Sequence, residues 1–164
     1  MGRISGSFDA KGLEDFQKKL EKIQASDLDA FVQSCAKELA ARLLRLAIKR
    51  TPVGQYPSGS GKVGGTLRRG WTAKTQEEAA GGKNTAAATY AASLPITHEG
   101  DTYTVEIINP VEYASYVEFG HRTANHKGWV EGQFMLTISE QELQRAAPGI
   151  LERKINKFLK ECMQ

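Results

Sequence analysis

Few features of this 164-residue sequence place it in a specialised class of protein. Its net charge is only +3, an excess too small to indicate nucleic-acid binding on its own. No apolar run approaches the roughly 20 residues that span a bilayer, and residues 1–12 lack the apolar core of a secretory signal. The two cysteines, Cys35 and Cys162, lie far apart, and we interpret them as reduced core thiols of a cytoplasmic protein. We therefore expect no membrane segment and no disulfide.

Motifs of the common enzyme classes are also missing. Residues 59–65, GSGKVGG, look like a phosphate-binding loop, but Tyr56 stands where the first glycine belongs and Val63 where the hydroxyl belongs. No Gly-x-Ser-x-Gly elbow occurs, and neither cysteine has an evident histidine partner. A pair of carboxylates can always be drawn from 19 acidic residues, so such a pair means little without geometry. We predict that the chain is not an enzyme and has no catalytic residue and no cofactor.

The three histidines do not form a convincing metal site. Glu118 and His121 have Glu-x-x-His spacing, but a di-metal bundle needs this motif twice, and Gly120 interrupts the helix. His98 and His126 have no second ligand at a spacing that suits zinc. We expect solvated loop histidines and no bound metal.

The N-terminal part of the chain is predicted to be helical. A first helix carries apolar residues at spacings of three and four, namely Leu13, Phe16, Leu20 and Ile23. A second helix begins at Ser26 and stops at Thr51–Pro52, because the residue before a proline avoids helical geometry. Its apolar face consists of Phe31, Cys35, Leu39, Leu43 and Leu46. At about 24 residues, or roughly 36 Å, it is the longest helix that the pattern predicts.

Two segments of biased composition follow this helix. The Gly-, Ser- and Pro-rich segment 54–65 and the Ala- and Gly-rich segment 74–93 are predicted to be flexible loops. Between them, LRRGWTAK fits a short strand with Leu67 and Trp71 facing inward.

A hairpin and a short helix are predicted next. Glu99–Gly100–Asp101 provide the turn, and Tyr103, Val105 and Ile107 then alternate with Thr104, Glu106 and Ile108. Asn109 is the expected cap of the short helix, Pro110 fits its first turn, and Gly120 is expected to end it in the left-handed conformation. We expect Tyr113, Tyr116 and Phe119 to pack this helix onto the sheet, with Val117 on the same inward side.

The C-terminal part is predicted to be a loop, residues 121–133, followed by helix. Ser139 and Glu142 fit a capping box at the start of that helix. Pro148 is expected to kink the helix or divide it. The order of elements predicts one α+β domain over residues 1–164. Long N-terminal helices and a C-terminal helix pack on a small antiparallel sheet, and the short helix follows the hairpin.

Glu118 lies among apolar neighbours in the sequence. A carboxylate near an apolar seam needs a cationic partner. We expect that partner to be Arg68, Arg69 or Arg122, either within one subunit or across a contact between subunits. Arg68 and Arg69, beside Trp71, are also the candidates for a weak contact with nucleic acid.

Three motifs occur in a fixed order along the chain. TPV at 51–53 ends the N-terminal helices, GTLRRGW at 65–71 follows the Gly-rich loop, and YASYVEFG at 113–120 follows the hairpin. Together they resemble the tail-component family of tailed bacteriophages that is named after the gene-10 product of phage HK97. The resemblance covers most of the chain. Many relatives have a proline soon after the glycine motif, which segment 132–138 of this chain lacks.

The resemblance implies a structural protein of a phage or prophage virion, assembled in the host cytoplasm. It implies a role in tail completion or joining at the head–tail junction, as a ring that contacts connector or neck proteins and tail-tube proteins. It implies a homo-oligomer in the virion and is compatible with a monomer in isolation. The alternatives are a minor tail protein or tail terminator, and a neck module that contacts nucleic acid. The candidate assembly residues are Arg68, Arg69, Trp71, Tyr113, Tyr116, Glu118, Phe119, Gly120 and Arg122.

Overall fold

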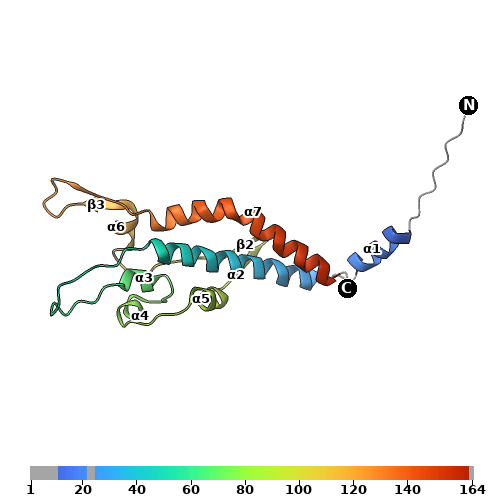
Figure 1. Ribbon diagram of the computed structural model, residues 1–164, viewed down its shortest axis with the longest axis horizontal. Helices are drawn as coiled ribbons and strands as arrows, with labels where there is room; N and C mark the ends of the chain where they lie inside the picture. Colours follow the sequence, from blue (N-terminus) through green and yellow to red (C-terminus); the bar gives the residue numbers. More distant parts are fainter. Residues whose placement is uncertain (1–10, 22–24, 163–164) are drawn as a thin grey trace, which may run out of the picture.

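A computed structural model describes residues 11–21 and 25–162 of the protein, and within them helices and short strands form an α+β structure, as predicted (Figure 1). The helices are α1 (Lys11–Glu21), α2 (Ala25–Arg50), α3 (Thr66–Gly70), α4 (Gln76–Ala80), α5 (Ala87–Ser93), α6 (Ala114–Phe119) and α7 (Met135–Cys162). The strands are β1 (Thr97–Glu99), β2 (Thr102–Thr104), β3 (Gly120–Arg122) and β4 (Trp129–Glu131).

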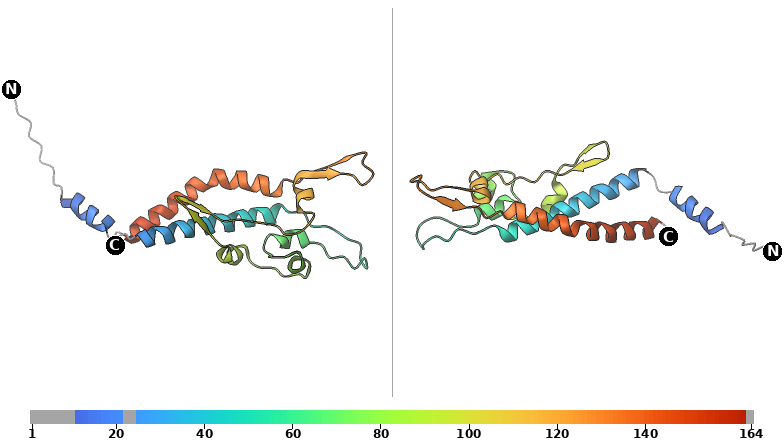
Figure 2. Two further views of the ribbon diagram at one scale, coloured as in Figure 1. Left: turned by 180° about the vertical axis from the view of Figure 1, so that it is seen from behind. Right: turned by 90° about the horizontal axis from the view of Figure 1, so that it is seen from above.

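The two longest helices, α2 and α7, lie side by side along the body (Figures 1 and 2). The predicted apolar face of α2 contacts α7. Phe31 stacks on Phe158 with 4.4 Å between the ring centroids, and Leu39 shares a groove with Leu151 and Ile155. Ion pairs that join the two helices are Arg50–Glu142 and Lys154–Glu38. This helix pair forms the framework to which the shorter elements attach.

A second face of α2 forms the main core. Its fully or nearly buried residues are Ala40, Ala41, Leu44 and Ala47. Against them pack Leu67, Trp71, Ala91, Val111 and Met135 from the shorter elements and the start of α7. Because alanine side chains are small, α5 can approach α2 closely, and side chains of α3 and its C-cap pack on the same face. Helix α2 is therefore covered on two sides instead of the one that the sequence pattern indicated.

Thr51 organises the end of α2, which stops at Arg50 as predicted. The Thr51 side chain is fully buried, and its hydroxyl accepts a 2.6 Å hydrogen bond from the Trp71 indole nitrogen. The same hydroxyl donates to the Ala47 carbonyl at 2.6 Å. The TPV and GTLRRGW motifs therefore meet at one buried hydrogen-bonded point, in which both polar groups are satisfied.

The strands form two separate antiparallel hairpins in the described part of the chain. In the predicted β1–β2 hairpin, Thr97 faces Thr104, and Gly100 adopts a positive φ of 57° in the turn. The predicted alternation also holds beyond β2, since Tyr103, Val105 and Ile107 are partly buried while their neighbours are exposed. The β3–β4 hairpin occupies residues 120–131, where we expected a loop, so that prediction is wrong.

Two further predictions of local structure are wrong. LRRGWTAK contains helix α3 instead of a strand. Leu67 and Trp71 are both buried as expected, but a spacing of four places two residues on one side of a helix as well as of a strand. The loop expected at 74–93 contains helices α4 and α5, and the Thr75 hydroxyl caps α4 by accepting from the Glu78 amide at 3.3 Å.

Helix α7 begins before the predicted capping box. Ser139 is buried inside the helix, where its hydroxyl donates to the Met135 carbonyl at 2.5 Å. Pro148 lies inside α7, which continues past it as one helix and changes direction along its length (Figure 2). Helix α1 is present, but the side chains of its expected stripe lie mostly outside the described residues, and Leu20 is exposed. Cys35 and Cys162 are free. Within residues 11–21 and 25–162, every helix is too short or too polar to cross a bilayer.

Candidate assembly surface

Glu118 is buried, and its partner is a helix end instead of an arginine. Its side chain is only 6% exposed. One carboxylate oxygen accepts from the Leu136 amide at 2.9 Å, and the other accepts from the Thr137 amide at 2.9 Å and its hydroxyl at 2.8 Å. These amides belong to the first turn of α7, where free N–H groups carry partial positive charge. The predicted pairing with an arginine of the same subunit is therefore wrong.

The backbone of α6 also holds the start of α7. The Gln133 amide donates to the Val117 carbonyl at 2.7 Å, and the Phe134 amide donates to the Glu118 carbonyl at 3.0 Å. Phe134 itself has a positive φ of 47°, so the chain turns sharply just before α7. The α6 segment of the YASYVEFG motif is therefore the cap of the C-terminal helix.

Arg68 and Arg69 both bind backbone carbonyls within the subunit. The Arg68 guanidinium donates to the Thr51 carbonyl at 2.7 and 3.2 Å. The Arg69 guanidinium donates to the Ala79 carbonyl at 2.8 Å and to the Gly64 carbonyl at 3.2 Å. Each arginine thus joins α3 to a neighbouring segment, and these contacts occupy donors that a phosphate would need. Trp71 lies in the core, at 3% exposure, and is not a surface residue.

Three aromatic residues that we expected to pack inward are exposed. The exposed fractions are 45% for Tyr113, 59% for Tyr116 and 60% for Phe119. Helix α6 has only six residues, and its inward side is occupied by Glu118 and Val117. The prediction that these aromatic residues pack the helix onto the sheet is therefore wrong, and their side chains remain available at the surface.

Gly120 connects α6 to β3 in a conformation that requires glycine. Its φ is 85° and its ψ is 170°, which is a positive φ as predicted but not the left-handed helical geometry. A Cβ there would collide with the Val130 carbonyl and approach the Gly132 amide to 2.9 Å. Gly120 therefore sets the direction in which the β3–β4 hairpin leaves the body. Arg122 lies exposed in β3.

The tip of the β3–β4 hairpin has a hydrogen-bonded turn. The Thr123 hydroxyl accepts from the Gly128 amide at 3.0 Å and donates to the Asn125 side chain at 2.6 Å. The Thr123 amide donates to the Gly128 carbonyl at 3.0 Å, and His126 takes a positive φ of 58°. This network gives the hairpin a defined shape, although its strands have only three residues each.

Exposed apolar side chains gather around this hairpin and the adjoining helix ends. We define the hairpin-end surface as Tyr116, Phe119, Trp129, Val130, Phe134 and Ile138, each of which is at least 40% exposed. The hairpin and the 54–65 loop extend from the same end of the body (Figures 1 and 2). Exposed apolar groups gathered in one region mark interaction sites in soluble proteins. The sequence analysis did not identify four residues of this surface: Trp129, Val130, Phe134 and Ile138. The only sequence signal for them was a Trp–Val pair next to a glycine.

Two observations on the described residues concern metal binding and the surroundings of Glu118. Within residues 11–21 and 25–162, no group of three or more His, Cys, Asp or Glu side chains could hold a metal ion. Beside Glu118 lies a cavity of about 250 Å³ that is largely apolar, with Trp71, Ile107 and Leu136 in its wall. The Glu118 carboxylate already accepts three hydrogen bonds, so it is poorly placed to act as a general base there.

A family model agrees with the arrangement of these motifs. The model described as "Bacteriophage HK97-gp10, putative tail-component" matches residues 14–120, which is well over half of the chain. The chain belongs to this family. It is a bacteriophage tail component, and hence a protein of the virion that interacts with other phage structural proteins. The match ends at Gly120, so β3, β4 and α7 lie almost entirely beyond it. No curated protein and no solved structure matches the chain.

Proposed function

We propose that this tail component acts at the head–tail junction, in tail completion or joining, as a ring of identical subunits. In this role it binds other virion proteins and catalyses no reaction. The observation that carries the proposal is the hairpin-end surface, which exposes aromatic and aliphatic side chains on a chain of a virion family.

The placement of these side chains favours assembly over catalysis. Aromatic residues are enriched in the cores of protein interfaces, because they bury large areas with few rotatable bonds. The hairpin-end surface occupies one end of an elongated body, and the opposite end of the α2–α7 pair has different elements (Figure 1). Copies that meet through unlike surfaces form a ring when the rotation closes.

The test is deletion of the coding sequence from the phage or prophage, followed by electron microscopy of the particles. We expect filled heads and separate tails, and expression of the wild-type chain in trans should restore complete virions. Intact virions from the deletion would contradict the proposal. Joined particles with tails of abnormal length would instead support the tail-terminator alternative.

A further inference from the structure

We propose that the ring contact forms when the β3–β4 hairpin of one copy docks in a groove between α2, α7 and the β1–β2 hairpin of the next copy. This inference deepens the proposed function and rests on the ring proposed there. It assigns both halves of a head-to-tail interface to segments of this chain.

The docking element is the β3–β4 hairpin. Trp129 is 55% exposed and Val130 is 43% exposed. Residues of β4 are exposed on both faces, so the hairpin carries apolar groups that no other part of the same subunit covers in the described structure. Two-stranded hairpins are marginal in water unless something packs against them. The hydrogen-bonded turn at Thr123 and Gly128 fixes the shape of this one before it binds, which reduces the entropy lost on docking.

The receiving groove lies between the two long helices. It has a volume of about 350 Å³ and a mainly aliphatic and aromatic wall, formed by Phe31, Val32, Leu39, Tyr103, Leu151 and Ile155. Ile155 is 44% exposed, so the groove is open to solvent along α7. A groove of this size and composition suits one aromatic and one aliphatic side chain.

The charges beside the two surfaces are opposite in sign. The β1–β2 hairpin, residues 97–104, contains Glu99 and Asp101 and no lysine or arginine, and Asp101 lines the groove. The β3–β4 hairpin contains Arg122 and Lys127 and has no acidic residue before Glu131. Unlike charges at the rim of an interface steer the encounter and fix its orientation.

Charged groups also lie near the groove on its two helices, and Arg153 and Lys157 of α7 are exposed. Lys154 donates to the Ser34 carbonyl at 3.3 Å and pairs with Glu38 at 3.4 Å. Asp29 accepts a 2.5 Å hydrogen bond from the Tyr103 hydroxyl and adds further negative charge beside the β1–β2 hairpin. On its β1–β2 side the groove therefore presents acidic groups to a basic hairpin, which makes a second copy the matching occupant.

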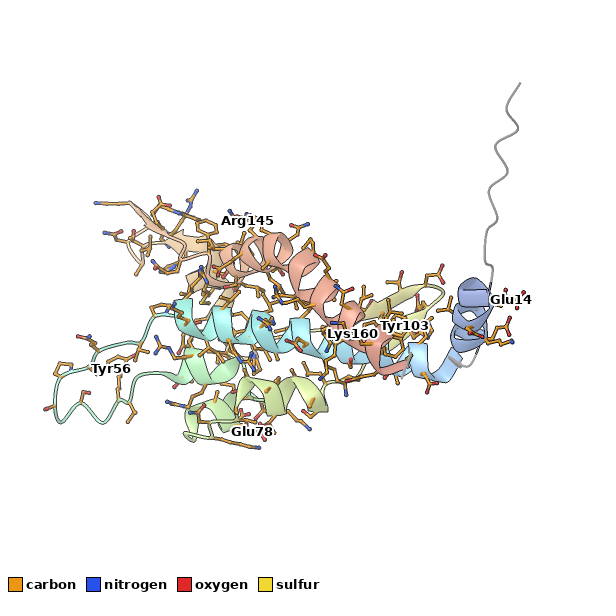
Figure 3. All side chains as sticks on the ribbon, turned by 45° about the vertical axis from the view of Figure 1, so that its right-hand side comes forward. Glu14, Tyr56, Glu78, Tyr103, Arg145 and Lys160 are labelled. Carbon is orange, nitrogen blue, oxygen red and sulfur yellow. The ribbon has the colours of Figure 1, made fainter. Side chains whose placement is uncertain are left out.

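The two surfaces cannot meet within one subunit. Ile155 lies 20 residues after Met135, which corresponds to about 30 Å along α7, and the β3–β4 hairpin leaves the body at the opposite end of that helix. Figure 3 shows Tyr56, in the loop beside the β3–β4 end, and Tyr103, in the groove wall, at opposite ends of the body. Contact between unlike ends of successive copies is the arrangement that a ring requires.

The test is disulfide trapping in assembled particles. A chain with Cys35→Ala and Cys162→Ser carries Val130→Cys on the hairpin and Ile155→Cys in the groove. A disulfide needs Cα atoms within about 7 Å, so this pair can close only between subunits. We expect oxidation of purified particles to produce a ladder of covalent multimers. The matched control pairs Val130→Cys with Arg145→Cys, on the outer side of α7 (Figure 3), and should give none.

A lysine-reactive cross-linker, applied to the same particles, separates the two proposals. If the lysine reagent produces covalent multimers and the cysteine pair does not, the ring proposal stands and the hairpin–groove contact is overturned. Absence of both ladders would overturn the ring itself and the contact with it.

Charge exchange provides a second readout that does not depend on cysteine geometry. Arg122→Glu with Lys127→Glu, and separately Glu99→Lys with Asp101→Lys, should each lower the yield of infectious particles by about tenfold or more, since each change is equivalent to losing one or two rim pairs. A chain that carries both sets should regain most of the yield. A combined variant no better than either parent would contradict the contact, and Arg145→Glu is the matched surface control.

Discussion

The two hairpins have the same strand length but differ in how they join the body. In the β1–β2 hairpin, the Tyr103 hydroxyl binds Asp29 of α2, and the His98 ring stacks on Tyr103 at 4.0 Å. Side chains thus hold it against the helix. The β3–β4 hairpin is held at its base through the backbone of Gly120 and Gly132, which lie too close to their neighbours for any Cβ. Its apolar side chains are left at the surface.

This difference separates a hairpin that completes the domain from one that is free to bind. A hairpin whose side chains contact the body has few groups left for a partner. A hairpin fixed by its backbone at one end can leave most of its side chains exposed, as those of β4 are here. The family match covers the first hairpin and stops at the first residue of the second.

The largest expected effect comes from the glycines of the two hairpins. Gly120→Ala forces a side chain into a φ, ψ region that is almost exclusive to glycine and against the Val130 carbonyl, so we expect a loss of about 2–4 kcal/mol. Gly100→Ala, in the β1–β2 turn, meets no atom within 4 Å and should cost only about 1 kcal/mol. Urea denaturation of both variants measures the contrast. Equal losses would show that the bases of the hairpins are equivalent.

The next effect concerns Glu118, which caps α7 beside the β3–β4 hairpin. Glu118→Gln places a side-chain NH₂ group against one of the backbone N–H donors of Leu136 and Thr137, so two buried donors face each other. We expect the free energy of unfolding to fall by about 1–3 kcal/mol. Glu112→Gln, an exposed carboxyl just before α6, is the matched control and should change stability by less than about 0.5 kcal/mol. Thermal unfolding monitored by circular dichroism is the measurement. A Glu118 variant as stable as the control would remove the capping role.

Trp129 tests whether the β3–β4 hairpin serves assembly, because removal of its side chain should affect assembly and not folding. Trp129 is exposed, so Trp129→Ala should leave the free energy of unfolding within about 0.5 kcal/mol of the wild type. If it fills the groove of the next copy, the yield of complete particles should fall by about tenfold or more, as for an interface anchor. Unfolding curves and particle counts together decide this. A large loss of stability in the free chain would mean that Trp129 belongs to the subunit core.

Periodic patterns predicted the long elements and the motif resemblance predicted the family. Helix α2 could be predicted from the sequence because apolar residues recur through its 26 residues and a proline follows its end. The β1–β2 hairpin could be predicted from its turn residues and from the alternation of apolar and polar residues after the turn. Helix α3 was mistaken for a strand, because a five-residue element is too short for a period of two to be distinguished from one of 3.6.

The candidate site was predicted only in part. The sequence analysis placed candidate assembly residues in the YASYVEFG motif, which stays a prediction. It did not find the partner of Glu118, because that partner is the positive end of a helix and not a charged side chain. We expected the aromatic residues of α6 to face inward because aromatic side chains usually pack in the core. In the structure, the carboxylate of Glu118 takes the buried position instead. The β3–β4 hairpin was missed because its strands are three residues long and its turn is polar.

The smallest expected effect is a pH dependence that only the β1–β2 hairpin should show. The Tyr103 hydrogen bond holds the pKa of Asp29 below its ordinary value of 3.8, and the carboxylate in turn raises the pKa of Tyr103. A depressed carboxyl pKa means that the contact stabilises the folded form above pH 3.8 and loses this contribution as pH falls through the folded value. Asp29 and Tyr103 are both only partly buried, so the change is local and small.

Amide hydrogen exchange measured from about pH 6 to about pH 3 tests this local effect. After correction for intrinsic exchange rates, protection of the β1–β2 amides should decline at the acid end, while that of the β3–β4 amides should not. Tyr103→Phe removes the hydrogen bond and should abolish the decline, since the Asp29 pKa then returns toward its ordinary value. A decline of equal size in both hairpins would mean that acid loosens the whole domain, and the distinction between a side-chain anchor and a backbone anchor would not hold.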